Sequence, residues 1–115
     1  MTDRQLQEPT RLVLTALADA PRHGYAIIQE VLAISEGRTR LRTGTLYTAL
    51  DRLLQQELIR VESEEVVSGR LRRTYTLTDQ GRNLLAEETR RLRIAVAEAE
   101  RRLGRARLLP NGASA

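Results

Sequence analysis

A chain of 115 residues that is 41% hydrophobic and 30% charged is long enough for one ordinary hydrophobic core and too short for two. It has no cysteine, which excludes disulfides and thiolate metal sites, and no apolar run approaches the ~20 residues of a membrane span. The net charge of +4 favours a polyanionic partner, although the exclusive use of arginine for the 19 basic residues is also explained by GC-rich coding. Because the N-terminus also lacks a basic segment followed by an apolar one, we expect a soluble, cytoplasmic protein.

The first part of the chain predicts two amphipathic helices. Pro9 suits the first turn of a helix over residues 9–18, whose apolar positions follow helical spacing. A second helix is expected from Tyr25 to near Ser35. We expect Tyr25 to pack in the core. The single histidine, His23, lies beside a turn and is interpreted as a capping or packing residue.

A third helix is predicted in the segment TGTLYTALDRLLQQELI, residues 43–59, with Thr43 as its N-cap. Its apolar side chains cluster on one side of a helical wheel: Leu46, Ala49, Leu50, Leu53 and Leu54. The other side carries small, hydroxylated and polar residues: Gly44, Thr45, Thr48, Asp51, Arg52 and Gln55. A surface helix normally shows mixed charge to water, so this face predicts a binding partner.

A hairpin and a long helix are predicted in the rest of the chain. Apolar and polar residues alternate on both sides of a Ser-Gly turn, which predicts a β-hairpin over residues 58–78 with an arginine-rich tip. Thr78 then caps a helix over roughly 78–104, whose first turn is weakened by Gly81. Apolar and small residues recur along it at spacings of four and three, as in a coiled coil: Leu85, Thr89, Leu92, Val96, Ala99 and Leu103.

Three helices followed by a hairpin form a winged helix-turn-helix arrangement. Four segments resemble the PadR family of bacterial transcriptional regulators: HGYAI at 23–27, GTLYTALDRL at 44–53, ELI at 57–59 and RRTYTLTDQGRNLLAEETRRL at 72–92. The resemblance covers about residues 11–100. It implies a homodimeric repressor whose C-terminal helix supplies the dimer contact and whose Gly-Thr-Leu-Tyr segment lies on the recognition helix. From the spacing along that helix, we expect the six residues named above to form the dimer contact.

We therefore expect a DNA-contacting surface made by the third helix and the hairpin. Its predicted residues are Arg42, Thr43, Gly44, Thr45, Tyr47, Thr48, Arg52, Arg70, Arg72 and Arg73. Tyr47 stands at the border of the apolar stripe, so a half-buried core position is an equal alternative. The arginines of the hairpin are interpreted as phosphate anchors rather than as solubilising residues of an edge strand.

Asp51 departs from the family pattern, in which a basic residue often follows the Ala-Leu pair. A carboxylate that faces phosphate is repelled, so Asp51 accepts a hydrogen bond from a cytosine amino group, pairs with an arginine, or marks weakened binding.

The six apolar and small residues of the last helix, which we call the seam, also have an alternative interpretation. They could pack against the first helix of the same chain. The paired residues Glu64, Glu65 and Glu87, Glu88 are interpreted as solvated faces.

Other classes of function have little support in the sequence. One histidine, no cysteine and scattered serines do not supply the groups of a catalytic constellation, so we expect no enzyme, no cofactor and no metal site. With three tyrosines and no Trp or Phe, the chain gives little support for an aromatic effector pocket, and the sequence does not identify a small-molecule effector.

The sequence thus predicts a mainly α protein with a small β-hairpin. The expected domains are a winged helix-turn-helix over 1–78, a dimerisation helix over 79–104 and a disordered tail over 105–115. Its expected function is a sequence-specific regulator of transcription, a homodimeric repressor that binds a palindromic operator in double-stranded DNA. The alternative is a winged-helix module that binds protein and does not read DNA, for which Asp51 is the main argument.

Overall fold

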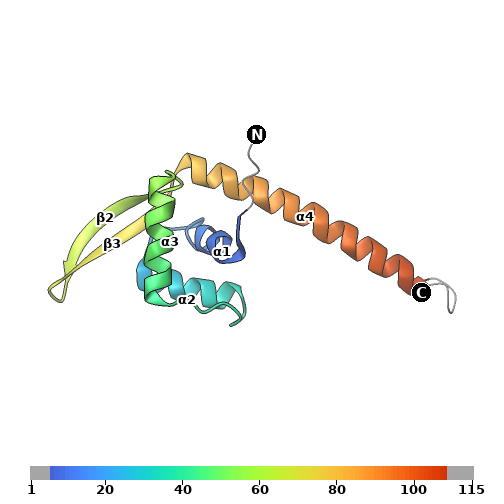
Figure 1. Ribbon diagram of the computed structural model, residues 1–115, viewed down its shortest axis with the longest axis horizontal. Helices are drawn as coiled ribbons and strands as arrows, with labels where there is room; N and C mark the ends of the chain where they lie inside the picture. Colours follow the sequence, from blue (N-terminus) through green and yellow to red (C-terminus); the bar gives the residue numbers. More distant parts are fainter. Residues whose placement is uncertain (1–5, 109–115) are drawn as a thin grey trace. The chain divides into compact units, whose positions relative to one another are not determined.

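The computed structural model describes residues 6–108. Along the chain lie α1 (Glu8–Ala16), β1 (Arg22–His23), α2 (Gly24–Ile34), α3 (Thr43–Gln55), β2 (Ile59–Val67), β3 (Arg70–Leu77) and α4 (Asp79–Leu108) (Figure 1). The chain divides into two compact units, Met1–Leu85 and Ala86–Ala115, which are described separately below. Helix α4 continues four residues beyond the predicted end at 104, and residues 109–115 of the predicted tail lie outside the described part.

The first two helices match their predicted positions closely. Pro9 lies in the first turn of α1, which ends at Ala16 rather than at residue 18. His23 is confirmed as a capping residue, because its Nδ1 accepts a hydrogen bond from the N–H of Ala26 at 3.4 Å. The prediction for Tyr25 is wrong: this side chain is 68% exposed. It lies about half a helical turn from the buried Ile27 and therefore points away from the core.

Helix α3 buries the apolar stripe that its sequence predicts. Leu46, Leu50 and Leu53 recur at spacings of four and three and are fully buried. The predicted N-cap is displaced by one residue, because Arg42 occupies that position without a side-chain cap and Thr43 is the first helical residue.

The sheet has three antiparallel strands in the order β1-β3-β2, one strand more than the predicted hairpin. The predicted turn is confirmed: Ser68 and Gly69 both have left-handed φ angles, of 53° and 78°, as a two-residue hairpin turn requires. The missed strand, β1, is only two residues long and pairs with Thr74 and Tyr75 of β3. Because α2 begins directly after β1, this pairing links the start of α2 to the hairpin.

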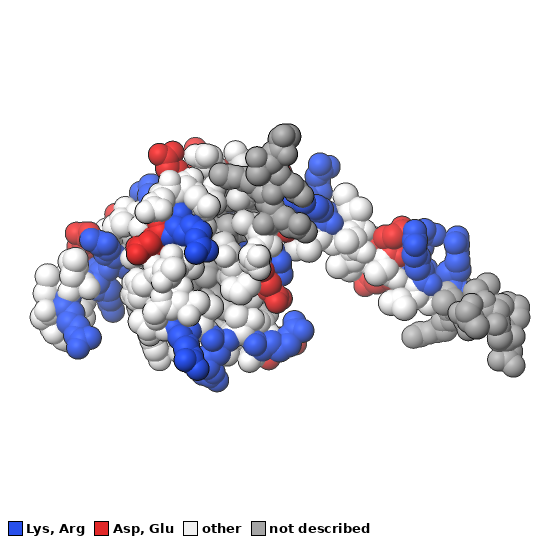
Figure 2. Space-filling model, viewed as in Figure 1, with Lys and Arg blue, Asp and Glu red and all other residues white. Residues whose placement is uncertain are grey.

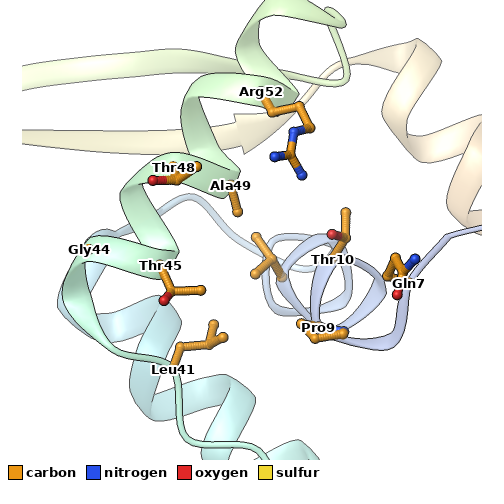
Figure 3. A pocket seen from close by; sticks show the side chains of 10 residues that line it. Gln7, Pro9, Thr10, Leu41, Gly44, Thr45, Thr48, Ala49 and Arg52 are labelled. Carbon is orange, nitrogen blue, oxygen red and sulfur yellow. The ribbon is translucent and has the colours of Figure 1, made fainter.

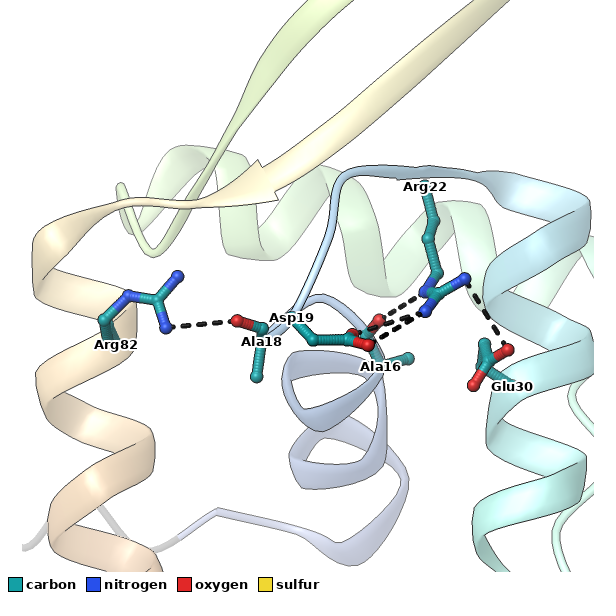
Figure 4. Close-up of polar contacts among 6 residues, drawn as sticks. All are labelled: Ala16, Ala18, Asp19, Arg22, Glu30 and Arg82. Atoms are coloured by element: carbon teal, nitrogen blue, oxygen red, sulfur yellow. Dashed lines mark hydrogen bonds and ion pairs between the residues drawn. The ribbon is translucent and has the colours of Figure 1, made fainter.

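One core holds the elements of the first unit together. Its largest fully buried side chains come from α1, α2, α3 and β2, from the residue that follows α1 and from the residue before β2: Val13, Leu14, Leu17, Ile27, Val31, Leu46, Leu50, Leu53, Leu58 and Ile59. Two arginines complete the polar groups at the end of α1 (Figure 4). Arg22 donates from Nε to the Ala16 carbonyl at 2.8 Å, and Arg82 donates to the Ala18 carbonyl at 3.1 Å. The first bond satisfies a carbonyl group that the end of α1 leaves without a partner, and the second holds the loop that follows α1.

The first turn of α4 is joined to the segment that follows α3. Thr78 Oγ1 accepts a hydrogen bond from the N–H of Gly81 at 3.0 Å, which confirms the predicted cap, and donates to the Glu57 carbonyl at 2.6 Å. A Cβ on Gly81 would lie 1.9 Å from the carbonyl oxygen of Leu58. The glycine that weakens this turn is therefore required by the close approach of two backbones.

In the second unit, α4 carries ion pairs along its length. Glu98 hydrogen-bonds to Arg101 and Arg102, and these bonds lower the pKa of Glu98. The interpretation of Glu88 as a solvated residue is wrong, because its side chain is 5% exposed and pairs with Arg91 at 3.0 Å. Within residues 6–108, no helix is long and apolar enough to span a bilayer.

Candidate nucleic-acid interface

The polar face of α3 is exposed along its whole length. Its residues all lie on the surface: Gly44, Thr45, Thr48, Asp51, Arg52 and Gln55. Arg42 and Thr43, at the start of the helix, are exposed as well. A Cβ on Gly44 would have no neighbour within 4 Å, so this glycine is required neither by packing nor by a left-handed backbone. The face combines hydroxyl, amide, carboxylate and guanidinium groups with little steric bulk.

Tyr47 occupies an intermediate position, with 44% of its surface exposed. Its ring lies against the first residue of α2, since a Cβ on Gly24 would come within 2.4 Å of the phenol oxygen and 3.0 Å of Cζ. Contact with α2 therefore covers part of the ring, and contact between Tyr47 and DNA stays a prediction. Part of the ring remains accessible beside the polar face of α3.

A hollow of about 330 Å³ separates α3 from the hairpin. It is lined by Tyr47 and Asp51 of α3 and by Leu71, Arg73 and Tyr75 of β3. Burial raises the pKa of Tyr75, and the nearby Tyr47 adds to this effect. Of the alternatives for Asp51, pairing with an arginine is not observed, because no arginine nitrogen of the described residues lies within 4.0 Å of its carboxylate.

Two of the three hairpin arginines have carboxylate partners across the strands. Arg73 donates from Nε to Glu64 at 2.8 Å, which raises the pKa of Arg73, and Arg72 pairs with Glu65 at 3.1 Å. Glu64 and Glu65 are thus exposed to solvent, as expected from the sequence. Their ion pairs with Arg73 and Arg72 were not predicted. Because neighbours on a strand point to opposite faces, Arg73 lies on the face towards α3 and Arg72 on the other.

The remaining basic residues near α3 lie at both ends of this surface. Figure 2 shows basic side chains at the end of the hairpin and over residues 35–42, the link between α2 and α3. Arg70 at the hairpin end and Arg42 at the start of α3 have no ion pair among the described residues. The positive charge available to a ligand is therefore greater at these two ends than in the middle of the hairpin.

A second hollow, of about 660 Å³, lies between α1 and α3 (Figure 3). Thr45, Ala49 and Arg52 line it from α3, and Pro9 and Thr10 line it from α1. Sequence reasoning missed this site, because no local pattern in residues 7–10 marks them as neighbours of α3. Within residues 6–108, no group of three His, Asp or Glu side chains could hold a metal ion.

The predicted dimer residues lie on α4. Leu85 is half-buried in the first unit, whereas the other five are exposed along the second unit: Thr89, Leu92, Val96, Ala99 and Leu103. Leu92 is 38% exposed, and Ile94, which is outside the predicted seam, is 62% exposed. Apolar side chains exposed at helical spacing are typical of a helix with a partner.

Comparisons with known proteins agree with this architecture. The profile of the Transcriptional regulator PadR-like family matches residues 13–87. A transcriptional regulator of Mycobacterium tuberculosis is 40% identical over 80 residues, which cover 70% of this chain and 71% of that protein. An uncharacterized 37.1 kDa protein of a Streptomyces fradiae transposon is 47% identical over 77 residues, or 67% of this chain. The match covers 21% of that relative's length.

Solved structures share the fold. A PadR family transcription regulator of Clostridium difficile superposes with a TM-score of 0.67 at 25% identity, covering 82% of this chain and 96% of that one. Bacillus subtilis PadR, solved in complex with operator DNA, gives a TM-score of 0.63 at 20% identity over 70% of this chain and 47% of that one. The winged helix-turn-helix arrangement, the family motifs and the match over residues 13–87 lead to one conclusion: the chain belongs to the PadR-like family of transcriptional regulators, which are not enzymes.

Proposed function

We propose that this chain is a sequence-specific regulator that represses transcription as a homodimer bound to a palindromic operator. The observation that carries the proposal is the exposed polar face of α3, which presents the hydrogen-bonding groups of a helix that enters the major groove. The operator complex of Bacillus subtilis PadR, which shares this fold, supports it.

The roles of the residues follow from their positions on α3 and the hairpin. Thr45 and Thr48 are placed to hydrogen-bond to base edges or to contact a thymine methyl group. Arg42 and Arg70, which have no ion pair among the described residues, are suited to phosphate. Gly44 allows the start of α3 to approach the duplex without the bulk of a side chain.

A dimer follows from the same reasoning. The exposed seam of α4 can pair with its copy, and a two-fold dimer presents two α3 helices to half-sites ~34–36 Å apart, one turn of the double helix. An operator with two inverted half-sites is the expected target.

A protein-binding module is the second candidate, and two observations favour it. Asp51 lies exposed on the polar face without an arginine partner among the described residues, and two hairpin arginines are already paired with glutamates. Steep salt dependence of binding to duplex DNA separates the two candidates, because phosphate neutralisation releases counterions.

Selection of bound duplexes from a random pool tests the proposal. The wild-type protein should enrich a palindrome, and Thr48→Ala should change the preferred base pair at one position of each half-site, by roughly 1–3 kcal/mol. Asp51→Ala should raise affinity for all duplexes, because it removes repulsion from phosphate, and should lower any preference for cytosine.

Two outcomes of this selection would contradict the proposal. One is a pool that yields no enriched sequence and no salt-dependent binding. The other is that both variants leave duplex binding unchanged while they weaken binding to a protein partner, which would favour the second candidate.

A further inference from the structure

We propose that α1 and α3 together form a seat for a phosphate of the DNA backbone, on the side of α3 opposite the hairpin. The seat is the 660 Å³ hollow between the two helices, and Arg52 and Thr10 are its main ligands. This inference rests on the proposed function. It adds α1 to the surface that binds the duplex and gives Arg52 a definite partner.

The geometry of the hollow places donors around one space. Figure 3 shows the Arg52 guanidinium directed from α3 into the gap towards α1, where Thr10 and Gln7 lie on the facing side. A guanidinium with hydroxyl and amide donors nearby is a typical environment for a phosphate group.

The charge of the hollow favours an anion. Among the described residues, Arg52 has neither an ion pair nor a side-chain hydrogen bond, so its charge is available to a ligand. No carboxylate belongs to the lining. The nearest acidic residue in sequence on α1, Glu8, is outside the lining and pairs with Arg11 at 3.6 Å.

The position of the hollow relative to α3 identifies the phosphate as one of the duplex. In Figure 1 the hairpin and α1 lie on opposite sides of α3, all within the first unit. A major groove is about 12 Å wide and is bounded by two sugar-phosphate backbones, so a helix inside it has one backbone on either side. The hairpin is placed for one backbone and the hollow for the other. A phosphate held there would fix the position of α3 in the groove without reading sequence.

Arg52→Gln and Thr10→Val test the seat on the full chain. Each variant should weaken binding to the selected operator and to random duplexes equally. For Thr10→Val the loss of affinity should be roughly three- to ten-fold for both kinds of DNA, as expected when one hydrogen bond is removed. Arg52→Gln should reduce the slope of log affinity against log salt by about one. Arg60→Gln, which removes an exposed arginine of β2 that lies outside the hollow and pairs with Glu62 at 2.9 Å, is the control and should leave the slope nearly unchanged.

Several outcomes would overturn the inference. If Arg52→Gln changes the preferred base at one position, Arg52 reads a base edge. If Arg52→Gln and Arg60→Gln have equal effects, the hollow holds no phosphate. If the wild type binds duplex DNA and both Arg52→Gln and Thr10→Val bind it equally well, only the phosphate seat is contradicted. If the wild type binds no duplex, the proposed function is contradicted as well.

A further experiment distinguishes a phosphate of the DNA backbone from a free anion as the ligand of the hollow. Inorganic phosphate at about 10 mM should raise the unfolding temperature of the wild type no more than sodium chloride of equal ionic strength. A larger rise that Arg52→Gln abolishes would identify a free anion as the ligand and overturn the duplex assignment.

Discussion

At the scale of single residues, two glycines lie where a side chain would meet a close neighbour. Gly81 brings the first turn of α4 onto the Leu58 carbonyl, and Gly24 leaves room for the Tyr47 phenol at the start of α2. The second contact is the more relevant to function, because it fixes a residue of α3 against its neighbouring helix.

Gly24→Ala should therefore destabilise the protein by about 1–3 kcal/mol, as overpacking does, and should weaken operator binding because Tyr47 must move. Tyr47→Phe removes the atom at 2.4 Å and should restore part of both properties in the double variant, with Cζ still close at 3.0 Å. Urea denaturation and duplex titration measure the two effects. A double variant as unstable as Gly24→Ala alone would contradict this account.

Gly44→Ala is the control for this comparison. A Cβ there meets open space, so alanine should stabilise α3 by about 0.5–1 kcal/mol while it hinders the approach to DNA. Sequence periodicity identifies Gly44 as an outward residue of α3. It cannot identify the role of Gly24, which depends on a residue 23 positions away in the chain.

At the scale of elements, the hairpin is less basic than its arginines suggest. Glu64 and Glu65 stand opposite Arg73 and Arg72 in the register of β2 and β3. A glutamate near the duplex repels phosphate and also holds the arginine that could bind it. Pairs of this kind at exposed sites contribute little to stability, so their effect is expected in binding.

Replacing both glutamates by glutamine should strengthen binding to all duplexes alike, because it removes two negative charges and releases two guanidinium groups. Arg72→Ala with Arg73→Ala should do the opposite and should flatten the salt dependence by roughly one unit for each phosphate that the variant no longer neutralises. Binding titrations over a range of salt concentrations measure both. Glu98→Gln, on α4, is the control for the removal of a negative charge, and a loss of specificity in the arginine variant would contradict a role restricted to phosphate.

Elements with a clear period were predictable from sequence, and those made by tertiary contacts were not. The stripe of α3 and the Ser-Gly turn follow from local pattern and turn chemistry. Strand β1 has two residues, too few for any alternation, and exists only because β3 pairs with it. The prediction for Tyr25 fails because an aromatic residue near Ile27 fits the apolar pattern by type but not by its angle on the helix.

At the scale of the whole molecule, the seam of α4 predicts the oligomeric state. Leu92→Asp should give a monomer, because it would bury an unpaired charge in the contact between two α4 helices. Ile94→Asp is the matched control: this apolar side chain of α4 lies outside the seam, so the variant should remain a dimer. Light scattering distinguishes the two. If Leu92→Asp stays dimeric, or if both variants dissociate, the assignment of the seam is wrong.

The joint between α3 and α4 has a mechanical consequence. Thr78 donates a hydrogen bond to the Glu57 carbonyl and Gly81 lies against the Leu58 carbonyl, so the segment that follows α3 contacts the first turn of α4 directly. Strand β2 begins and strand β3 ends beside this contact. A displacement of the first turn of α4 would therefore act on the Glu57 and Leu58 carbonyls, close to the end of α3.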